Sequence, residues 1–247
     1  MTITLCEVKA TFFIYNCVLN ILFLHGWGGN ADSFAPISQY LARITDSNGT
    51  SYRILTPTLP CPPAAVYTLE DYADDVDAYL QANGVARCVV VAHSFGARLV
   101  AVLHARHPQL FTKIVITGGA GLPVRRVWVR LKIGWYKFWR RLGVPIKGGS
   151  ADYRSLDDNG KKTFQNIVNR DLSWEFSQIT APVLLIWGAR DKATPLSLCR
   201  RLACLIPHAQ QQIYRHGGHF AYLEDAARFV RDVRNFIEGG QDASVVK

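Results

Sequence analysis

Ala92-His93-Ser94-Phe95-Gly96 directly follows the apolar run Cys88-Val89-Val90-Val91. A serine between small residues at the end of a buried strand is typical of a sharp strand-to-helix turn, which exposes the serine hydroxyl as a nucleophile. Residues 98–105 then have the apolar spacing of a helix, which Pro108 ends. This stretch therefore predicts a strand, a nucleophile turn at Ser94 and a helix. The alternative is that Ser94 only caps the helix, because serine is a favoured N-cap residue.

A glycine-rich turn follows an apolar run nearer the N-terminus. Ile21-Leu22-Phe23-Leu24 leads into His25-Gly26-Trp27-Gly28-Gly29. Such a turn can direct backbone N–H groups into a cavity, where two donors stabilise the negative charge that develops during acyl transfer. We expect these oxyanion-hole donors to be the backbone N–H groups of Trp27 and Phe95. Taken by itself, the turn would favour a simple tight loop, but the motifs that follow support the oxyanion-hole interpretation.

Two further apolar runs precede a carboxylate and an imidazole. Residues 183–188 come just before Asp191, and residues 211–214 come just before His219. A serine hydroxyl needs an imidazole to accept its proton and a carboxylate to orient that imidazole. Ser94, Asp191 and His219 also occur in the chain order expected for a nucleophile turn of this type. We therefore predict these three residues as the catalytic set.

In these motifs the chain resembles the α/β-hydrolase fold superfamily, in particular its small, capped, esterase-like members. The segments that carry the resemblance are residues 25–29, 93–96, 187–191 with Pro195, and 218–220. In order and spacing they cover nearly the whole chain. The resemblance implies that Ser94 is the nucleophile, that His219 is the general base and then the acid, and that Asp191 orients His219. Ala92 departs from the pattern, because the family usually has glycine there.

Other side chains compete for the roles of base and acid. His216 lies three residues before His219, but the glycine pair before His219 and the Phe220 after it match the family turn better. Residues 118–122, after another expected strand, contain no acid that could replace Asp191. We expect structural roles for His25 and His93 and surface positions for His104, His107 and His208.

Length and composition agree with one catalytic domain that carries an insertion. The 247 residues are 49% hydrophobic, which is enough for a large core. Near-continuous apolar runs alternate with helical segments, as in a mostly parallel sheet that helices cover on both faces. Further strands are expected at residues 53–56 and 113–116, and a helix capped by Thr68 at residues 68–80. The sequence therefore predicts an α/β fold.

The resemblance also implies a division of the chain. The α/β-hydrolase core is expected at residues 1–120 and 179–247, and a helical cap over the active site at residues 121–178. A shortened hairpin is expected near the N-terminus, at residues 3–8 and 11–15. The apolar stretch from residue 12 to residue 24 is too short to cross a bilayer, and Asn16 and Asn20 interrupt it.

The first half of the predicted cap is both basic and aromatic. Residues 124–147 contain eight Lys or Arg residues and no acidic residue, so much of the net charge of +9 lies there. The aromatic residues expected to line a substrate pocket are Trp128, Trp135, Phe138 and Trp139. We interpret the stretch as an amphipathic cap helix, with a membrane-surface helix as the second interpretation. Nucleic-acid binding is disfavoured because no reader motif accompanies the charge. A basic cap also favours substrates with an anionic end.

Little in the sequence indicates a cofactor or an oxidising compartment. No Cys/His cluster has the spacing of metal ligands, and no glycine-rich loop matches a phosphate-binding pattern. We therefore expect neither a metal nor a cofactor. The six cysteines show no paired spacing, which favours free thiols and the cytoplasm.

These motifs predict a serine hydrolase, specifically a carboxylesterase that cleaves small to medium acyl or aryl esters through an acyl-enzyme. In the family that the chain resembles, the same residues also serve lactone, amide, thioester and carbon–carbon bond hydrolysis. A ligand receptor that keeps the catalytic residues without turnover is the alternative from another class of protein. The sequence predicts neither the natural substrate nor the oligomeric state.

Overall fold

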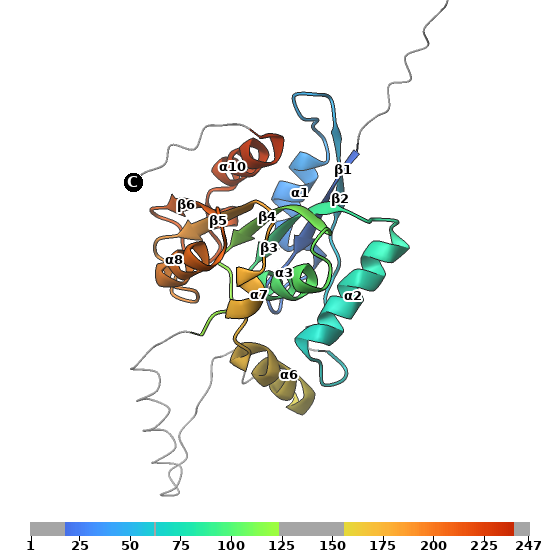
Figure 1. Ribbon diagram of the computed structural model, residues 1–247, viewed down its shortest axis with the longest axis vertical. Coiled ribbons are helices and arrows are strands. Elements are labelled where there is room, and N and C mark those ends of the chain that lie inside the picture. The colour runs from blue at the N-terminus through green and yellow to red at the C-terminus, as the bar shows by residue number, and fades with distance from the viewer. Residues whose placement is uncertain (1–17, 62, 124–155, 240–247) are drawn as a thin grey trace, which may run out of the picture.

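A computed structural model describes residues 18–61, 63–123 and 156–239 (Figure 1). Six parallel strands form one sheet in the order β2-β1-β3-β4-β5-β6. The strands are β1 (Val18–Leu24), β2 (Ser51–Leu55), β3 (Cys88–His93), β4 (Phe111–Thr117), β5 (Val183–Gly188) and β6 (Gln210–Tyr214). The six strands expected within these ranges are confirmed. Both β3 and β5 are buried at every position, which is why their sequences are almost continuously apolar.

Helices cover both faces of this sheet, so the α/β fold class is confirmed. They are α1 (Ala35–Leu41), α2 (Leu69–Ala82), α3 (Phe95–Arg106), α6 (Asp158–Asn169), α7 (Ser173–Ser177), α8 (Leu196–Leu205), α9 (Ala221–Glu224) and α10 (Ala226–Glu238), with a 3-10 helix at Ala31–Phe34. In Figure 1, α1 and α10 lie on one face of the sheet, and α2, α3 and α8 lie on the other. The expected cap of α2 is also present, because Thr68 and Asp71 form a capping box.

Alternate residues of each central strand enter two separate cores. Ile21 and Phe23 of β1 pack with α1 and α10, whereas Leu22 and Leu24 pack with α2 and α3. This is the period-two alternation of a strand whose two faces are both covered. Because all six strands are parallel, their carboxyl ends meet at one edge of the sheet, and the loops after β1, β3, β5 and β6 carry the predicted site residues.

Glycine is required at position 96 because the first turn of α3 lies against β1. A Cβ atom on Gly96 would lie only 2.3 Å from the carbonyl oxygen of Leu24. We expect Gly96→Ala to lower the free energy of unfolding by about 1–3 kcal/mol, the usual cost of an overpacked core. Urea denaturation followed by circular dichroism measures this loss. An unchanged midpoint would contradict the close approach of α3 to β1.

Some predictions fall wholly or partly outside the described residues. The N-terminal hairpin at residues 3–8 and 11–15 does so entirely. Of the predicted cap at residues 121–178, the structure describes residues 121–123 and 156–178, which include α6 and α7. The division into core and cap stays a prediction. Within the described ranges, no helix combines the length and the apolar character that crossing a bilayer requires.

Candidate active site

Ser94 lies on a strained turn between β3 and α3. Its backbone angles are φ 49° and ψ −104°, a conformation that residues other than glycine rarely adopt. Three backbone hydrogen bonds hold the turn: Ser94 N–H donates to the Thr117 carbonyl at 3.1 Å, and the Ser94 carbonyl accepts from Ala97 and Ala120 at 3.2 and 3.0 Å. The Ser94 side chain makes no capping hydrogen bond. Ser94 therefore takes the N-cap position of α3 without capping the helix through its hydroxyl.

The structure brings Asp191 and His219 together at the same edge of the sheet. Asp191 follows β5 and His219 follows β6, and His219 Nδ1 lies 2.8 Å from Asp191 Oδ2. The Asp191 side chain is fully buried, and that of His219 is 19% exposed. With Nδ1–H donated to the carboxylate, Nε2 is the ring nitrogen that can accept a proton. This is the pairing that a serine nucleophile needs.

Hydrogen bonds keep the buried carboxylate of Asp191 ionised. Its Oδ1 atom accepts from the backbone N–H groups of Ala193 and Thr194, each at 2.8 Å. Its Oδ2 atom lies 2.8 Å from the Thr194 hydroxyl as well as near His219. Burial alone would raise the pKa of Asp191, but the hydrogen bonds from His219 and Thr194 lower it below its usual value. Asp191 is therefore an anion, and in this form it can orient His219.

Two other histidines have the structural roles that the sequence predicts. His25 Nδ1 lies 2.8 Å from the Gly26 carbonyl, and His25 Nε2 accepts from Leu59 N–H at 3.0 Å. His93 Nε2 lies 3.1 Å from the carbonyl oxygen of His219. Burial, together with the neighbouring His219, lowers the pKa of His93 to about 3. His93 is therefore neutral near pH 7 and supports the loop that carries His219.

The remaining histidines follow the prediction less completely. His107 and His208 are exposed, as expected. His104 is fully buried, so its expected surface position is wrong. The reason is that α7 and the residues after it pack against α3, and His104 Nε2 accepts a hydrogen bond from Thr180 N–H at 3.2 Å.

Ser94 and His219 line the same cavity, which has a volume of about 560 Å³. This volume is typical of small-molecule sites. Trp27 and Phe95 also line the cavity. Across the described residues, neither of their backbone N–H groups donates to another protein group; for Phe95 this follows from its position at the start of α3. Both amides are therefore available to an oxyanion, although this role stays a prediction.

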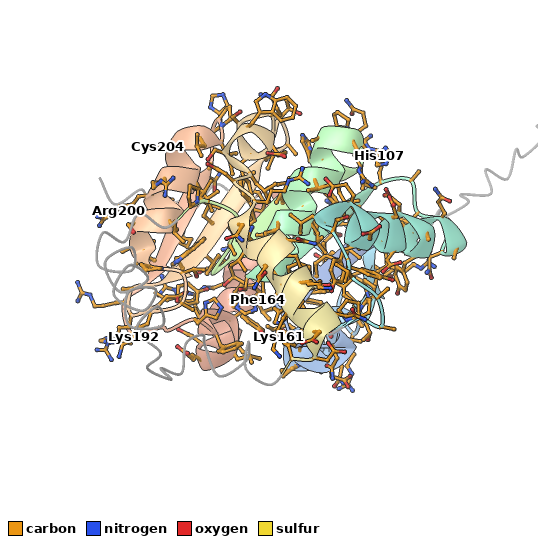
Figure 2. The ribbon with its side chains drawn as sticks, turned by 90° about the horizontal axis from the view of Figure 1, so that it is seen from below. His107, Lys161, Phe164, Lys192, Arg200 and Cys204 are labelled. Carbon is orange, nitrogen blue, oxygen red and sulfur yellow. The ribbon has the colours of Figure 1, made fainter. Side chains whose placement is uncertain are left out.

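The expected pocket residues Trp128, Trp135, Phe138 and Trp139 lie outside the described residues. The described part of the predicted cap contributes other side chains to the cavity wall, namely Phe164, Ile167 and Val168 of α6. In Figure 2, α6 is the element nearest the viewer, Phe164 is labelled on it, and α3 lies behind. The Phe164 ring packs edge-on against Trp27 at 5.5 Å between centroids. The spacing of these three apolar residues at i, i+3 and i+4 is a signal that could have identified them.

Thr194 is a positioning residue that our interpretation of the sequence missed. Its hydroxyl lies 2.8 Å from Asp191 Oδ2 and 3.0 Å from the Gly118 carbonyl. Its one proton can be donated to either oxygen, and the hydroxyl therefore lies between the carboxylate and the loop after β4. The signal was a hydroxyl residue three positions after the predicted acid.

Removing the Thr194 hydroxyl should weaken the support of Asp191. We expect Thr194→Val to lower kcat about 10-fold, the usual scale for a group that orients another functional side chain. Thr194→Ser keeps the hydroxyl and should stay near the wild-type value. Steady-state turnover of any substrate that the wild type accepts, with kcat and KM separated, measures the effect. A Thr194→Val enzyme with unchanged kcat would contradict the role.

The part of the chain that the structure describes contains no cluster of side chains typical of a metal site. No group of three or more His, Cys, Asp or Glu side chains is arranged there to hold an ion.

Comparisons with known proteins agree with the parallel sheet and its covering helices. Residues 21–232 match the model of the alpha/beta hydrolase family, and the chain therefore belongs to this family. It is 24% identical to a 2-hydroxy-6-oxononadienedioate/2-hydroxy-6-oxononatrienedioate hydrolase of Cupriavidus pinatubonensis, over 88% of this chain and 86% of that protein.

Two solved structures share the fold. A membrane phospholipase A described as a bacterial virulence factor aligns with a TM-score of 0.70 and 22% identity, over 91% of this chain and 80% of that one. The enol-lactonase of Burkholderia xenovorans aligns with a TM-score of 0.67 and 21% identity, over 89% of this chain and 91% of that one. At these identities the structural similarity shows the fold alone.

Proposed function

We propose that this chain is a serine hydrolase that cleaves carboxylic esters of small to medium acyl or aryl groups through an acyl-enzyme. One observation carries the proposal: a buried carboxylate holds His219 at 2.8 Å, and His219 lines the same cavity as Ser94 on its strained turn. A pairing of this kind activates a serine hydroxyl.

In this mechanism, Ser94 Oγ forms a bond to the ester carbonyl carbon while its proton passes to His219 Nε2. The carbonyl oxygen becomes an oxyanion, which the backbone N–H groups of Trp27 and Phe95 stabilise. The carbon–oxygen bond to the alcohol then breaks, and the alcohol leaves with the proton from His219. Water attacks the acyl-enzyme by the reverse route, giving its proton to His219, and the acid leaves as Ser94 regains its proton.

A second candidate reaction uses the same residues on a different bond. The Cupriavidus relative is named as a hydrolase of an oxononadienedioate, and one solved neighbour is an enol-lactonase. These similarities support a test of lactones and of diketones with a cleavable carbon–carbon bond beside the esters.

A substrate panel combined with a covalent label tests the proposal. Short-chain p-nitrophenyl esters, lactones, amides and vinylogous diketones are incubated with the purified protein, and a fluorophosphonate probe is mapped by mass spectrometry. We expect steady ester turnover and a single label on Ser94. Labelling elsewhere would show that another residue is the nucleophile, and tight ligand binding without any turnover would favour the receptor alternative.

We also propose that the protein acts in the cytoplasm. Cys61, Cys88, Cys199 and Cys204 are all unpaired, and two of them are buried in the core. Free buried thiols are typical of a reducing compartment. Fractionation of the native cells tests this proposal.

A further inference from the structure

Arg98 is a buried cation on the wall of the candidate active site. It lies on α3, one helical turn after Ser94, and therefore on the same side of the helix. Its side chain lines the cavity that contains Ser94 and His219, and the residue is only 6% exposed. Charged residues are rarely buried to this extent unless a partner compensates them.

Among the described residues, the hydrogen bonds of Arg98 involve only one of its three guanidinium nitrogens. Nη1 donates to the backbone carbonyls of Ile167 and Arg170, at 2.7 and 3.2 Å, at the end of α6. Within the described ranges, Nε and Nη2 have no hydrogen-bond partner, and no carboxylate forms an ion pair with Arg98. The two carbonyls at the helix end supply only a partial negative charge.

The other arginines of this region are paired differently. Arg170 contacts the carboxylates of Glu70 and Glu175, and Arg106, also on α3, contacts Asp74 at 2.7 Å. Burial lowers the pKa of Arg98 to about 10, so that its guanidinium is still protonated near pH 7. Arg98 therefore carries a positive charge without a matching anion from the described chain.

The rest of the described cavity wall carries no carboxylate. None of the described residues that line it is Asp or Glu, and most of them are apolar or aromatic. The Nε and Nη2 groups of an arginine form a planar fork that matches the two oxygens of a carboxylate. A short acyl chain could therefore place its terminal carboxylate on this fork while its carbonyl carbon lies at Ser94.

We propose that Arg98 binds a carboxylate of the substrate, and that the preferred substrates are esters whose acyl chain ends in a carboxylate. This proposal rests on the proposed ester hydrolysis and assigns its substrate class. A carboxylate on the acyl side stays bound to Arg98 during both acylation and deacylation, because the acyl group remains on Ser94 after the alcohol has left. Arg98 touches the substrate in this proposal but takes no part in proton transfer.

Paired substrates test the proposal. Monomethyl glutarate and methyl pentanoate have acyl chains of equal length and differ in the terminal carboxylate. The same comparison is made for the monomethyl esters of succinic, glutaric and adipic acids, each against the neutral methyl ester of the same chain length. The readout is the ratio of kcat/KM for the acidic ester to kcat/KM for its neutral partner, measured by pH-stat. We expect the wild type to prefer the best of the acidic esters, and Arg98→Gln to lower that ratio about 10- to 100-fold.

Two variants control this experiment. Arg106→Gln removes a positive charge from the same helix away from the cavity, and should leave the ratio unchanged. Arg98→Lys keeps the charge without the fork and should lower the ratio less than Arg98→Gln does. A general loss that affects acidic and neutral esters equally would show that Arg98 only ties α3 to α6, and would overturn the proposal.

A binding measurement separates this proposal from the proposed function. Calorimetric titration of Ser94→Ala with glutarate should give binding that the double variant Ser94→Ala with Arg98→Gln loses. If the protein hydrolysed no ester but bound glutarate through Arg98, the carboxylate site would be supported and the proposed ester hydrolysis would be overturned. The opposite result is ester turnover that depends on Ser94, equal ratios of kcat/KM in wild type and Arg98→Gln, and no glutarate binding. That result would overturn the carboxylate site alone.

Discussion

Replacing Ser94 with alanine should lower kcat for ester hydrolysis about 10⁶-fold, the scale found when a serine nucleophile is removed. The carbonyl carbon then has no protein oxygen to attack it, whereas the His219–Asp191 pair and the predicted oxyanion donors are unchanged. Turnover of a p-nitrophenyl ester measures the loss, and the fluorophosphonate label should disappear with it.

A serine far from the cavity provides the control for this variant. The Ser177 hydroxyl donates to the Trp174 carbonyl at 2.7 Å on α7 and does not line the cavity. Ser177→Ala should keep wild-type turnover and labelling. If Ser94→Ala retained more than a hundredth of the wild-type kcat with a normal circular dichroism spectrum, another residue would have to be the nucleophile.

Replacing Asp191 with asparagine should lower kcat about 10⁴-fold. Asp191 now accepts the Nδ1 proton of His219 at 2.8 Å, which leaves Nε2 free to accept a proton from Ser94. An amide can donate to Nδ1 instead, and the imidazole then carries its proton on Nε2. Because the amide has nearly the same shape as the carboxylate, the loss comes from the wrong tautomer and from missing charge.

Single-turnover kinetics identify which step Asp191→Asn affects. We expect slow acylation of Ser94 with little change in KM. Asp191→Glu lengthens the side chain while keeping the charge, and should also lose activity because Thr194 and Ala193 fix the present position of the carboxylate. An Asp191→Asn variant that acylates within tenfold of the wild-type rate would show that another acid orients His219.

Local patterns in the sequence predicted the sheet and the position of the site well. Strands such as β3 and β5 are buried on both faces, so their apolar runs can be recognised without knowledge of their neighbours. The loops after these strands hold Ser94 and Asp191, and the rule that parallel strands end at one edge places them together. The pairing of Asp191 with His219 therefore agrees with the prediction, while their catalytic roles stay a proposal.

Features that depend on distant contacts could not be predicted in the same way. His104 is on α3 in a helical pattern, and nothing near it in the sequence shows that the chain around Thr180 covers it. The position of Arg98 on the cavity wall depends on α6, which lies about 60 to 70 residues further along the chain. Such burial depends on packing between elements rather than on local periodicity.

The sheet order has a consequence for how activity returns during refolding. Ser94 follows β3 and His219 follows β6, and β4 and β5 lie between these two strands in the sheet. All of these pairings are parallel and join segments that are far apart in the chain, which makes them slow to form. After dilution from denaturant, helical circular dichroism should therefore recover before hydrolytic activity, because Ser94 and His219 come together only when the strands from β3 to β6 have all paired.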